Sequence, residues 1–197
     1  MATLPESSIT QLLTPYLPTI PADLPLKLSL YLDLLLKWNA RTNLTAIRDP
    51  EEIVQRHFGE SLFAAQHLPP ATRTLLDFGS GAGFPGLPIA LLRPEILVTL
   101  AESQNKKSTF LREVVRTLAL PNAEVWPNRV EVMPSTRLFD IVALRAVDDM
   151  AAALPAARLR IAPGGRLAIL TTANRAPAGG TSIPLPNSRF GIFSLGS

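Results

Sequence analysis

The sequence predicts an α/β fold in which a mainly parallel sheet is flanked by helices and preceded by a small helical subdomain. Three observations support this. Residues 1–70 contain only helical patterns, short apolar segments alternate with helical ones from residue 71 onward, and a glycine-rich turn follows the first strand candidate. Alternating strands and helices require right-handed crossovers and parallel strands. We therefore expect a helical subdomain at 1–70 and a ligand-binding domain at 71–197.

The first 70 residues are expected to hold two clear helices after an irregular or broken helical arm at 1–25, where five prolines lie. In Leu26 to Ala40 the apolar residues recur on one helical face. The second helix begins with Asp49 as N-cap, Pro50 in the first turn and Glu52 in the position of a capping box. A pair of prolines ends it.

The second part of the chain is expected to contain five strands separated by helices. The predicted strands are Leu75 to Phe78, Leu97 to Ala101, Ala123 to Trp126, Ile141 to Leu144, and Arg166 to Leu170. The predicted helices are Pro85 to Leu92, Gln104 to Leu118, and Asp148 to Ile161. Pro155 should kink or shorten the last of these. Residues 173–188 are rich in small residues and proline and predict a loop.

Composition excludes several classes of protein. The chain has 197 residues and no cysteine, which rules out disulfides and cysteine-based metal sites or nucleophiles. With only two histidines, we expect no metal site. No apolar run reaches the roughly 18 residues that would cross a bilayer, and no signal peptide is evident, so a cytoplasmic protein without membrane contact is expected. The net charge of +3 permits a nucleic-acid partner without requiring one.

The segment from Leu75 to Gly86 predicts a ligand-binding turn. An apolar strand runs into Gly79, Gly81 and Gly83 and then into a helix. Glycines there let the backbone turn sharply and approach a ligand, while the helix start offers free amide N–H groups. This arrangement suits a nucleotide-like ligand at the carboxyl ends of the strands. By itself, a glycine triplet is also compatible with a purely structural turn.

Two acids beside this turn strengthen the nucleotide interpretation. Glu102 ends the second strand about 20 residues after the turn, where an acid accepts hydrogen bonds from ribose hydroxyls. It also stands where a charge favours the dipole of the following helix. Asp77 precedes the first glycine by two residues, and the Gly-x-Gly-x-Gly spacing differs from that of dinucleotide-binding folds. The loop resembles the S-adenosylmethionine loop of class I methyltransferases, in which this acid orients the methionine part of the cofactor.

A more specific resemblance extends over roughly residues 28 to 170. The segment from Leu36 to Pro50, followed by Arg56-His57-Phe58 and Glu60-Ser61-Leu62, is similar to the N-terminal signature of the glucose-inhibited division protein B family. Members of that family methylate guanine N7 in small-subunit (16S) ribosomal RNA. Further matching segments are Asp77 to Gly86, Leu91-Arg93-Pro94-Glu95, Lys106-Lys107, Phe110-Leu111, Asn128-Arg129-Val130-Glu131, Phe139-Asp140 and Leu144-Arg145-Ala146.

The resemblance implies a pocket for S-adenosyl-L-methionine. Gly79 and Phe84 would line it, Glu102 would hold the ribose, and Val130 and Glu131 would sit beside the adenine. Arg145 would lie where cofactor and target base meet, which makes it the candidate catalytic residue. Strand carboxyl ends in open parallel sheets face the ligand crevice, in agreement with that placement. Phe84 and Val130 are equally compatible with ordinary core packing.

The implied partner is 16S rRNA or the small ribosomal subunit, bound by a monomer. Candidates for RNA contacts are Arg48, Arg56, His57 and Arg129, although any one of these arginines is also compatible with solvated surface charge. Guanine N7 carries a lone pair and no proton, so its methylation needs alignment rather than a general base. The groove that exposes N7 in A-form RNA is deep and narrow, so the target should be irregular or unpaired.

The chain departs from the family pattern after the fifth strand. The family usually carries a Leu-Lys-Gly turn, a helix and two more strands, whereas this chain reads Leu170-Thr171-Thr172-Ala173-Asn174. A loop then leads to Ile183 to Pro186 and Arg189 to Leu195, which predict one closing edge strand. A helix and a strand would therefore be missing. The alternatives are a small-molecule methyltransferase, a cofactor- or RNA-binding module with little activity and, more remotely, a nicotinamide-dependent oxidoreductase.

Overall fold

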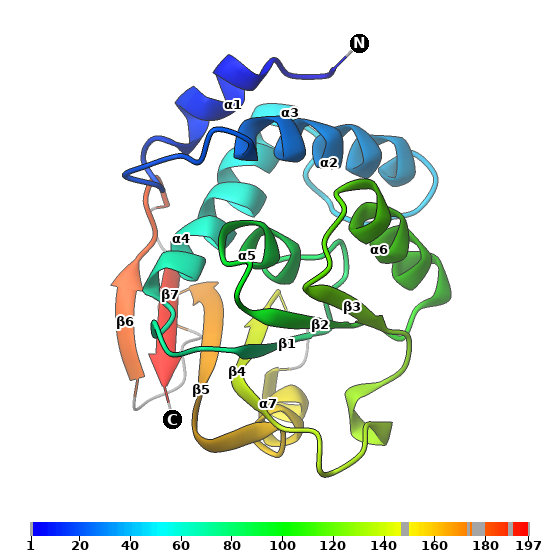
Figure 1. Cartoon of the computed structure of the whole chain (residues 1–197), viewed down its shortest axis with the longest axis vertical. Coiled ribbons are helices and arrows are strands. Elements are labelled where there is room, and N and C mark those ends of the chain that lie inside the picture. Colours follow the sequence, from blue (N-terminus) through cyan, green and yellow to red (C-terminus); the bar gives the residue numbers. More distant parts are fainter. Residues whose placement is uncertain (1, 147–149, 173, 175–179, 189–190, 197) are drawn as a thin grey trace.

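A seven-stranded sheet covered on both faces by helices forms the protein (Figure 1). The computed structural model describes residues 2–146, 150–172, 174, 180–188 and 191–196. The strands lie in the order β3-β2-β1-β4-β5-β7-β6. Strands β1 to β5 are parallel, whereas β7 runs antiparallel to β5 and β6 antiparallel to β7. This confirms the predicted α/β class with a mainly parallel sheet.

The elements follow the chain in the predicted alternation. The strands are β1 (Thr74–Phe78), β2 (Leu97–Ala101), β3 (Ala123–Trp126), β4 (Phe139–Arg145), β5 (Ile161–Thr172), β6 (Gly180–Pro184) and β7 (Gly191–Gly196). The α-helices are α1 (Glu6–Leu13), α2 (Leu24–Asn39), α3 (Pro50–Ile53), α4 (Glu60–His67), α5 (Gly86–Leu92), α6 (Asn105–Thr117) and α7 (Met150–Arg158). Between α3 and α4 lies a π-helical turn, η1 (Val54–Gly59), and after β3 a short 3-10 turn, η2 (Val130–Val132).

Strand register brings three chain segments together at one edge of the sheet. Phe78 at the end of β1 pairs with Ala101 at the end of β2 on one side and with Leu144 of β4 on the other. Because these strands are parallel, the residues that follow each of them emerge side by side. The glycine turn, Glu102 and Arg145 therefore meet at the carboxyl edge of the sheet.

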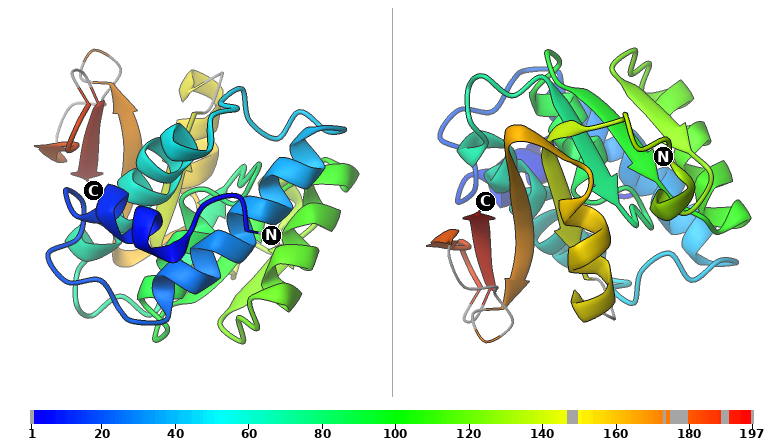
Figure 2. Two further views of the ribbon diagram at one scale, coloured as in Figure 1. Left: turned by 90° about the horizontal axis from the view of Figure 1, so that it is seen from above. Right: turned by 90° about the horizontal axis from the view of Figure 1, so that it is seen from below.

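Alternation along β4 divides the core between the two faces of the sheet. Ile141 and Ala143 belong to the larger hydrophobic cluster, whereas Val142 and Leu144 belong to the smaller one. This follows from the two-residue period of side chains on a strand. The larger cluster is covered by α2, α4, α5 and α6, and the smaller one by α7 and η2. Figure 2 shows the two opposite faces, with the N-terminal helices over one and α7 over the other.

The helices of the first 70 residues share their core with the sheet. Leu13 of α1, Leu28 of α2 and Phe58 of η1 lie in the same buried cluster as Leu75 of β1 and Leu100 of β2. The division of the chain at residue 70 stays a prediction. The shared cluster means that these helices have a fixed place over the sheet.

The C-terminal part differs from the prediction because it contains two strands rather than one. Strand β6 occupies part of the predicted loop at 173–188. All residues of β7 pair with the second half of β5. Only the family's additional helix therefore has no counterpart among the described residues. The prediction of a loop was wrong because β6 contains glycine and proline, which are typical of loops but are also tolerated in an edge strand. Residues 173, 175–179 and 189–190 in these segments lie outside the described residues.

Other helices and strands begin or end a few residues away from the predicted positions, which is the usual uncertainty of such boundaries. The irregular arm at 1–25 contains the helix α1, and the parallel strands β4 and β5 are longer than predicted. The last helix, predicted from Asp148, is described from Met150 and keeps Pro155 inside it. Asp148 itself lies outside the described residues.

The helix that begins at Pro50 has the predicted cap. The Asp49 carboxylate accepts a hydrogen bond from the backbone N–H of Glu52 at 2.8 Å. The cap matters for the site because the same helical stretch continues through η1, which carries His57, into α4.

Replacing Asp49 with alanine is expected to lower the free energy of unfolding by about 1 kcal/mol, the usual cost of losing an N-cap side chain. Asp49→Asn keeps the accepting oxygen and serves as the matched control. Urea denaturation of the three proteins measures the difference. Equal losses in both variants would show that the charge, rather than the cap hydrogen bond, stabilises the helix.

Candidate functional site

The turn after β1 leaves open space beside its first glycine. Gly79, Gly81 and Gly83 all adopt positive φ angles, of 71°, 56° and 92°, which glycine tolerates best. A side chain at Gly83 would collide with Leu87 and Tyr31, whereas nothing lies within 4 Å of a Cβ placed at Gly79. Gly83 is thus required for packing, while Gly79 borders the space where a ligand has room.

Asp77 is a buried carboxylate with one unused oxygen. Its Oδ2 accepts a hydrogen bond from the backbone N–H of Gly86 at 3.0 Å, and its Oδ1 has no hydrogen-bond partner among the described residues. The side chain is almost fully buried at the end of β1. Burial raises the pKa of Asp77 to about 7, and the Gly86 hydrogen bond opposes that rise. A buried carboxylate without a partner lowers the stability of the protein unless a hydrogen-bond donor or a cation binds its free oxygen.

Glu102 joins the glycine turn to the start of α6. Its Oε2 accepts from the backbone N–H of Gly81 at 2.9 Å, and its Oε1 accepts from that of Gln104 at 2.8 Å. Its own backbone N–H donates to the carbonyl of Trp126 at 3.0 Å. The carboxylate therefore lies between the ends of β1 and β3, and its contact with a ligand stays a prediction.

The segment after β3 carries the predicted adenine neighbours, and their contact with a ligand stays a prediction. Val130 is buried in the smaller hydrophobic cluster, whereas Glu131 is exposed. Arg129 is also exposed, and its guanidinium has no ion pair or hydrogen bond among the described residues. The Trp126 indole N–H donates to the Arg129 carbonyl at 3.2 Å, which fixes this turn to the end of the strand.

A stack of rings runs from the glycine turn to the N-terminal helices. The Phe84 ring stacks on Tyr31 of α2, with centroids 5.5 Å apart, and on the His57 imidazole of η1, with centroids 4.7 Å apart. The Tyr31 hydroxyl donates to the carbonyl of Ala82. Phe84 is thus both a buried core residue and the contact between the turn and η1.

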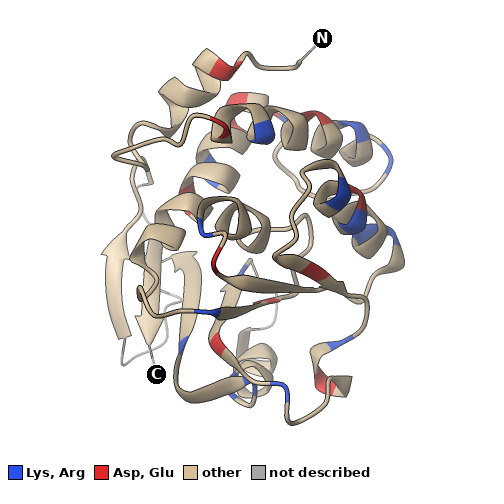
Figure 3. Ribbon diagram, viewed as in Figure 1, with Lys and Arg blue, Asp and Glu red and all other residues tan. Residues whose placement is uncertain are grey.

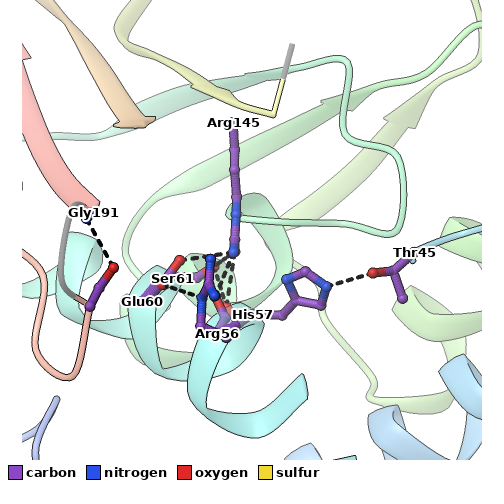
Figure 4. Close-up of polar contacts among 8 residues, drawn as sticks. Thr45, Arg56, His57, Glu60, Ser61, Arg145 and Gly191 are labelled. Carbon is purple, nitrogen blue, oxygen red and sulfur yellow. Dashed lines mark hydrogen bonds and ion pairs between the residues drawn. The ribbon is translucent and has the colours of Figure 1, made fainter. Parts of the chain in front are cut away.

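Arg145 anchors the end of β4 to the π-helical turn (Figure 4). Its guanidinium donates to the carbonyls of Arg56 and His57, to the Ser61 hydroxyl, and to the Glu60 carboxylate at 2.9 Å. The residues that it joins are 84 to 89 positions earlier in the chain. π-Helical turns are frequent at functional sites, and this one has carbonyls free to accept from Arg145.

Burial, together with two neighbouring guanidinium groups, keeps His57 neutral. Burial and the nearby Arg145 and Arg56 guanidinium groups lower the pKa of His57 to about 3. Its Nε2 lies 2.7 Å from the Thr45 hydroxyl, and its Nδ1 has no partner among the described residues. Glu60 is buried and binds Arg145 and Arg56 with its two oxygens. His57 therefore does not act as a cationic group near neutral pH.

Most of the predicted residues gather at this edge, but in differing roles. Asp77, the glycines and Phe84 lie at or directly after the end of β1, and Glu102 accepts a hydrogen bond from that turn. Val130 belongs to the smaller hydrophobic cluster. Arg56, His57 and Arg145 form a polar network at the end of β4. Arg48 instead holds its own loop, donating to the Asn39 carbonyl at 2.8 Å and to the Asn43 side chain at 3.2 Å. The catalytic assignment of Arg145 stays a prediction, since its contacts here are structural.

Sequence reasoning missed the roles of Tyr31 and Glu60. Tyr31 lies on the apolar face of α2, where an aromatic residue is indistinguishable from ordinary core. Glu60 follows Arg56 by four residues, the spacing of an exposed helical ion pair. Its burial depends on Arg145, which the sequence places far away.

Asp77→Asn is expected to raise the free energy of unfolding of the ligand-free protein by about 1–3 kcal/mol at pH 8, because asparagine keeps the acceptor for Gly86 without a buried charge. The folded pKa of about 7 exceeds the usual 3.8, so the wild type loses stability as the pH rises from 3.8 to about 7. Urea unfolding at several pH values measures the gap, which should shrink toward pH 5. A gap independent of pH would contradict the raised pKa.

Arg145→Met is expected to lower the free energy of unfolding by about 2–4 kcal/mol, because Glu60 stays buried with only the half-exposed Arg56 as a partner. Adding Glu60→Gln to that variant removes the unpaired charge and should recover part of the loss. Urea denaturation of both variants measures the difference. If the double variant were no more stable than the single one, the charge pair would not be the source of the effect.

Two classes of site have no support in the part of the chain that the structure describes. No group of three or more histidine, aspartate or glutamate side chains is arranged to hold a metal ion among residues 2–146, 150–172, 174, 180–188 and 191–196. Within the same ranges, no helix is long and apolar enough to cross a membrane.

Solved structures share this fold. A putative O-methyltransferase from Klebsiella pneumoniae superposes with a TM-score of 0.62 at 13% identity, over 96% of this chain and 95% of that one. The glycopeptide N-methyltransferase MtfA, solved with (S)-adenosyl-L-methionine, superposes with a TM-score of 0.50 at 15% identity, over 71% of this chain and 66% of that one. The fold is therefore that of class I methyltransferases, as the glycine turn predicted.

Sequence comparison identifies the family. The model of the GidB family, described as rRNA small subunit methyltransferase G, matches residues 26–176. A ribosomal RNA small subunit methyltransferase G of Xanthomonas campestris pv. campestris (strain B100) is 42% identical over 149 residues, which are 76% of this chain and 69% of that protein. The matched region agrees with the resemblance at roughly 28–170. The chain belongs to the rRNA small subunit methyltransferase G family.

Proposed function

We propose that this protein transfers a methyl group from S-adenosyl-L-methionine to N7 of a guanine in 16S ribosomal RNA. Family membership supports an rRNA methyltransferase. The observation that carries the cofactor assignment is the Asp77 carboxylate, whose buried Oδ1 lacks a partner among the described residues. Asp77 precedes Gly79 by two residues, and nothing lies within 4 Å of a Cβ placed at Gly79. S-adenosylmethionine carries an ammonium and a sulfonium group, so a buried acid with an unused oxygen suits it.

The other predicted cofactor residues fit the same ligand. Each Glu102 oxygen accepts one backbone N–H and keeps capacity for another donor, so both ribose hydroxyls have acceptors. Val130 offers an apolar contact for the adenine, and the adjacent Glu131 is exposed beside it. In this proposal Gly79 and Gly81 approach the cofactor with their backbone, Gly83 gives the turn its shape, and Phe84 closes it from behind.

The chemistry asks for positioning rather than proton transfer. When bound, the cofactor supplies a methyl group on a sulfonium: the sulfur–methyl bond breaks, the carbon–N7 bond forms, and the positive charge passes to the base. In this proposal Asp77 and Glu102 bind the cofactor. The ring stack of Tyr31, Phe84 and His57 keeps water from the side of the turn. We propose that Arg145 acts by fixing η1 against β4.

RNA contacts would come from the side of the pocket that η1 and the preceding loop form. Arg56 is half exposed and Arg129 has a free guanidinium, which suits phosphate contact. Arg48 would contribute mainly by shaping its loop, and His57, which is neutral, by stacking or hydrogen bonding. The partner would be 16S rRNA or the small ribosomal subunit, which places the protein in the cytoplasm. We propose that a monomer acts, with residues 1–70 as the helical subdomain.

Calorimetric titration with S-adenosylmethionine tests the pocket. We expect micromolar affinity, about −8 kcal/mol, in the wild type and no binding by Gly79→Asp, whose side chain fills the cofactor's space. Gly164→Asp is the matched control, because Gly164 has a similar φ of 80° and equally open surroundings at the opposite edge of the sheet. Retained affinity in Gly79→Asp would overturn the placement of the cofactor.

The affinity should also depend on pH through Asp77. A cation prefers the ionised carboxylate, so S-adenosylmethionine should bind more tightly as the pH rises from about 6 to about 8, through the Asp77 pKa of about 7. Asp77→Asn should bind weakly and without this dependence. Titration of both proteins at several pH values checks it. A wild-type affinity that stayed constant over this range would contradict the role of Asp77.

Methyl transfer to undermethylated small ribosomal subunits tests the reaction. We expect label from methyl-labelled cofactor in 16S rRNA, released as 7-methylguanine. Label at another atom or base would overturn the guanine N7 assignment. Cofactor binding without transfer to RNA would favour the small-molecule enzyme or the inactive binding module.

A further inference from the structure

Positive charge gathers on one face formed by α2 and α6 (Figure 3). We call this the α2–α6 face and define it by six cations. They are Lys37, Arg41, Lys106, Lys107, Arg112 and Arg116. All are exposed except the partly buried Lys107, and none forms an ion pair or side-chain hydrogen bond within the described part of the chain. The charge of this face is therefore available to a partner.

Several cations elsewhere are engaged by acids of the chain. Lys27 pairs with Asp23, Arg93 with Glu95, and Arg137 with Glu124. Arg56 and Arg145 share Glu60. On α6 the single acid, Glu113, accepts a hydrogen bond from the Trp38 indole N–H at 2.9 Å. The α2–α6 face is thus strongly basic, although the net charge of the whole chain is only +3.

The two helices hold these cations in a fixed arrangement. The Trp38 ring packs edge-on against Phe110, with centroids 5.8 Å apart, and its N–H reaches Glu113. Arg112 and Arg116 are four residues apart, which places them together on the exposed side of α6. Cations held by packed helices present a preformed row of charge, so a polyanion binds without first ordering the chain.

The α2–α6 face adjoins the proposed methylation site. Helix α6 begins at Asn105, three residues after Glu102, and Glu102 itself accepts the backbone N–H of Gln104. The loop that leaves α2 continues from Arg41 to Thr45, whose hydroxyl contacts His57. A strand of nucleic acid lying on this face would therefore reach the carboxyl edge of the sheet without leaving the surface.

We infer that the α2–α6 face holds the phosphate backbone of the rRNA segment next to the target guanine. The inference rests on the proposed function and names the surface that the substrate uses. Lysine and arginine contacts to phosphates position a nucleic acid without reading its sequence. Positioning by the backbone leaves the target base free to turn into the pocket at the ends of β1 and β2.

The test measures binding of a 16S rRNA fragment and of small subunits without cofactor, between about 50 and 200 mM salt. The variant is Arg112→Gln with Arg116→Gln, both exposed and outside the cofactor pocket. The control is Arg73→Gln with Arg166→Gln, two exposed arginines. Arg73 directly precedes β1, and Arg166 of β5 pairs with Ile141 near the amino end of β4. Both pairs change the net charge equally.

We expect the α6 variant to bind RNA about 10-fold more weakly at low salt, with a slope of log affinity against log salt reduced by about 1.4, or about 0.7 for each lost phosphate contact. The control should match the wild type, and all proteins should bind S-adenosylmethionine equally. An α6 variant with wild-type affinity and slope would overturn the inference, as would equal losses in variant and control. Failure of the proposed function would appear separately, as wild-type protein that does not methylate rRNA.

Discussion

The buried guanidinium of Arg145 holds the two halves of the site together. Arg145 is the last residue of the central strand β4, and it donates to two carbonyls of η1, the Ser61 hydroxyl and the Glu60 carboxylate. Burying this charge costs free energy unless every N–H of the guanidinium has a partner. The position of η1 is therefore fixed relative to the end of β4. The position of His57 over Phe84, and of Phe84 behind the glycine turn, depends on the same contact.

Asp77 shows how a proposed ligand site conflicts with stability. A carboxylate with one unsatisfied oxygen, buried at the end of a central strand, weakens the ligand-free protein. In the proposed function, the same oxygen would give a cationic cofactor a partner in a site shielded from water. Glu102 differs because both of its oxygens already stabilise the backbone around the turn. In the proposed function both acids would bind the cofactor, but only Glu102 also stabilises the backbone of the turn with both of its oxygens.

The distribution of charge follows a similar division. Acids near the site neutralise the cations that build it, as Glu60 does for Arg56 and Arg145, and leave the cations of the α2–α6 face unpaired. Arginines that look alike in the sequence thus have different roles. Arg48 closes its own loop, Arg145 is a buried anchor, and Arg112 is free on the surface.

The sequence by itself determined the α/β class, five parallel strands, the glycine turn and the acid at the end of β2, because these depend on local periodicity and on residue types with few alternatives. Only the tertiary structure decided that Arg145 binds η1, that Glu60 is buried and that the closing part forms two strands. Those features depend on contacts between residues more than 80 positions apart, or on an edge strand whose glycine and proline resemble a loop. Periodicity carries no information about which distant charge will be nearest, so the pairing of charges had to come from the fold.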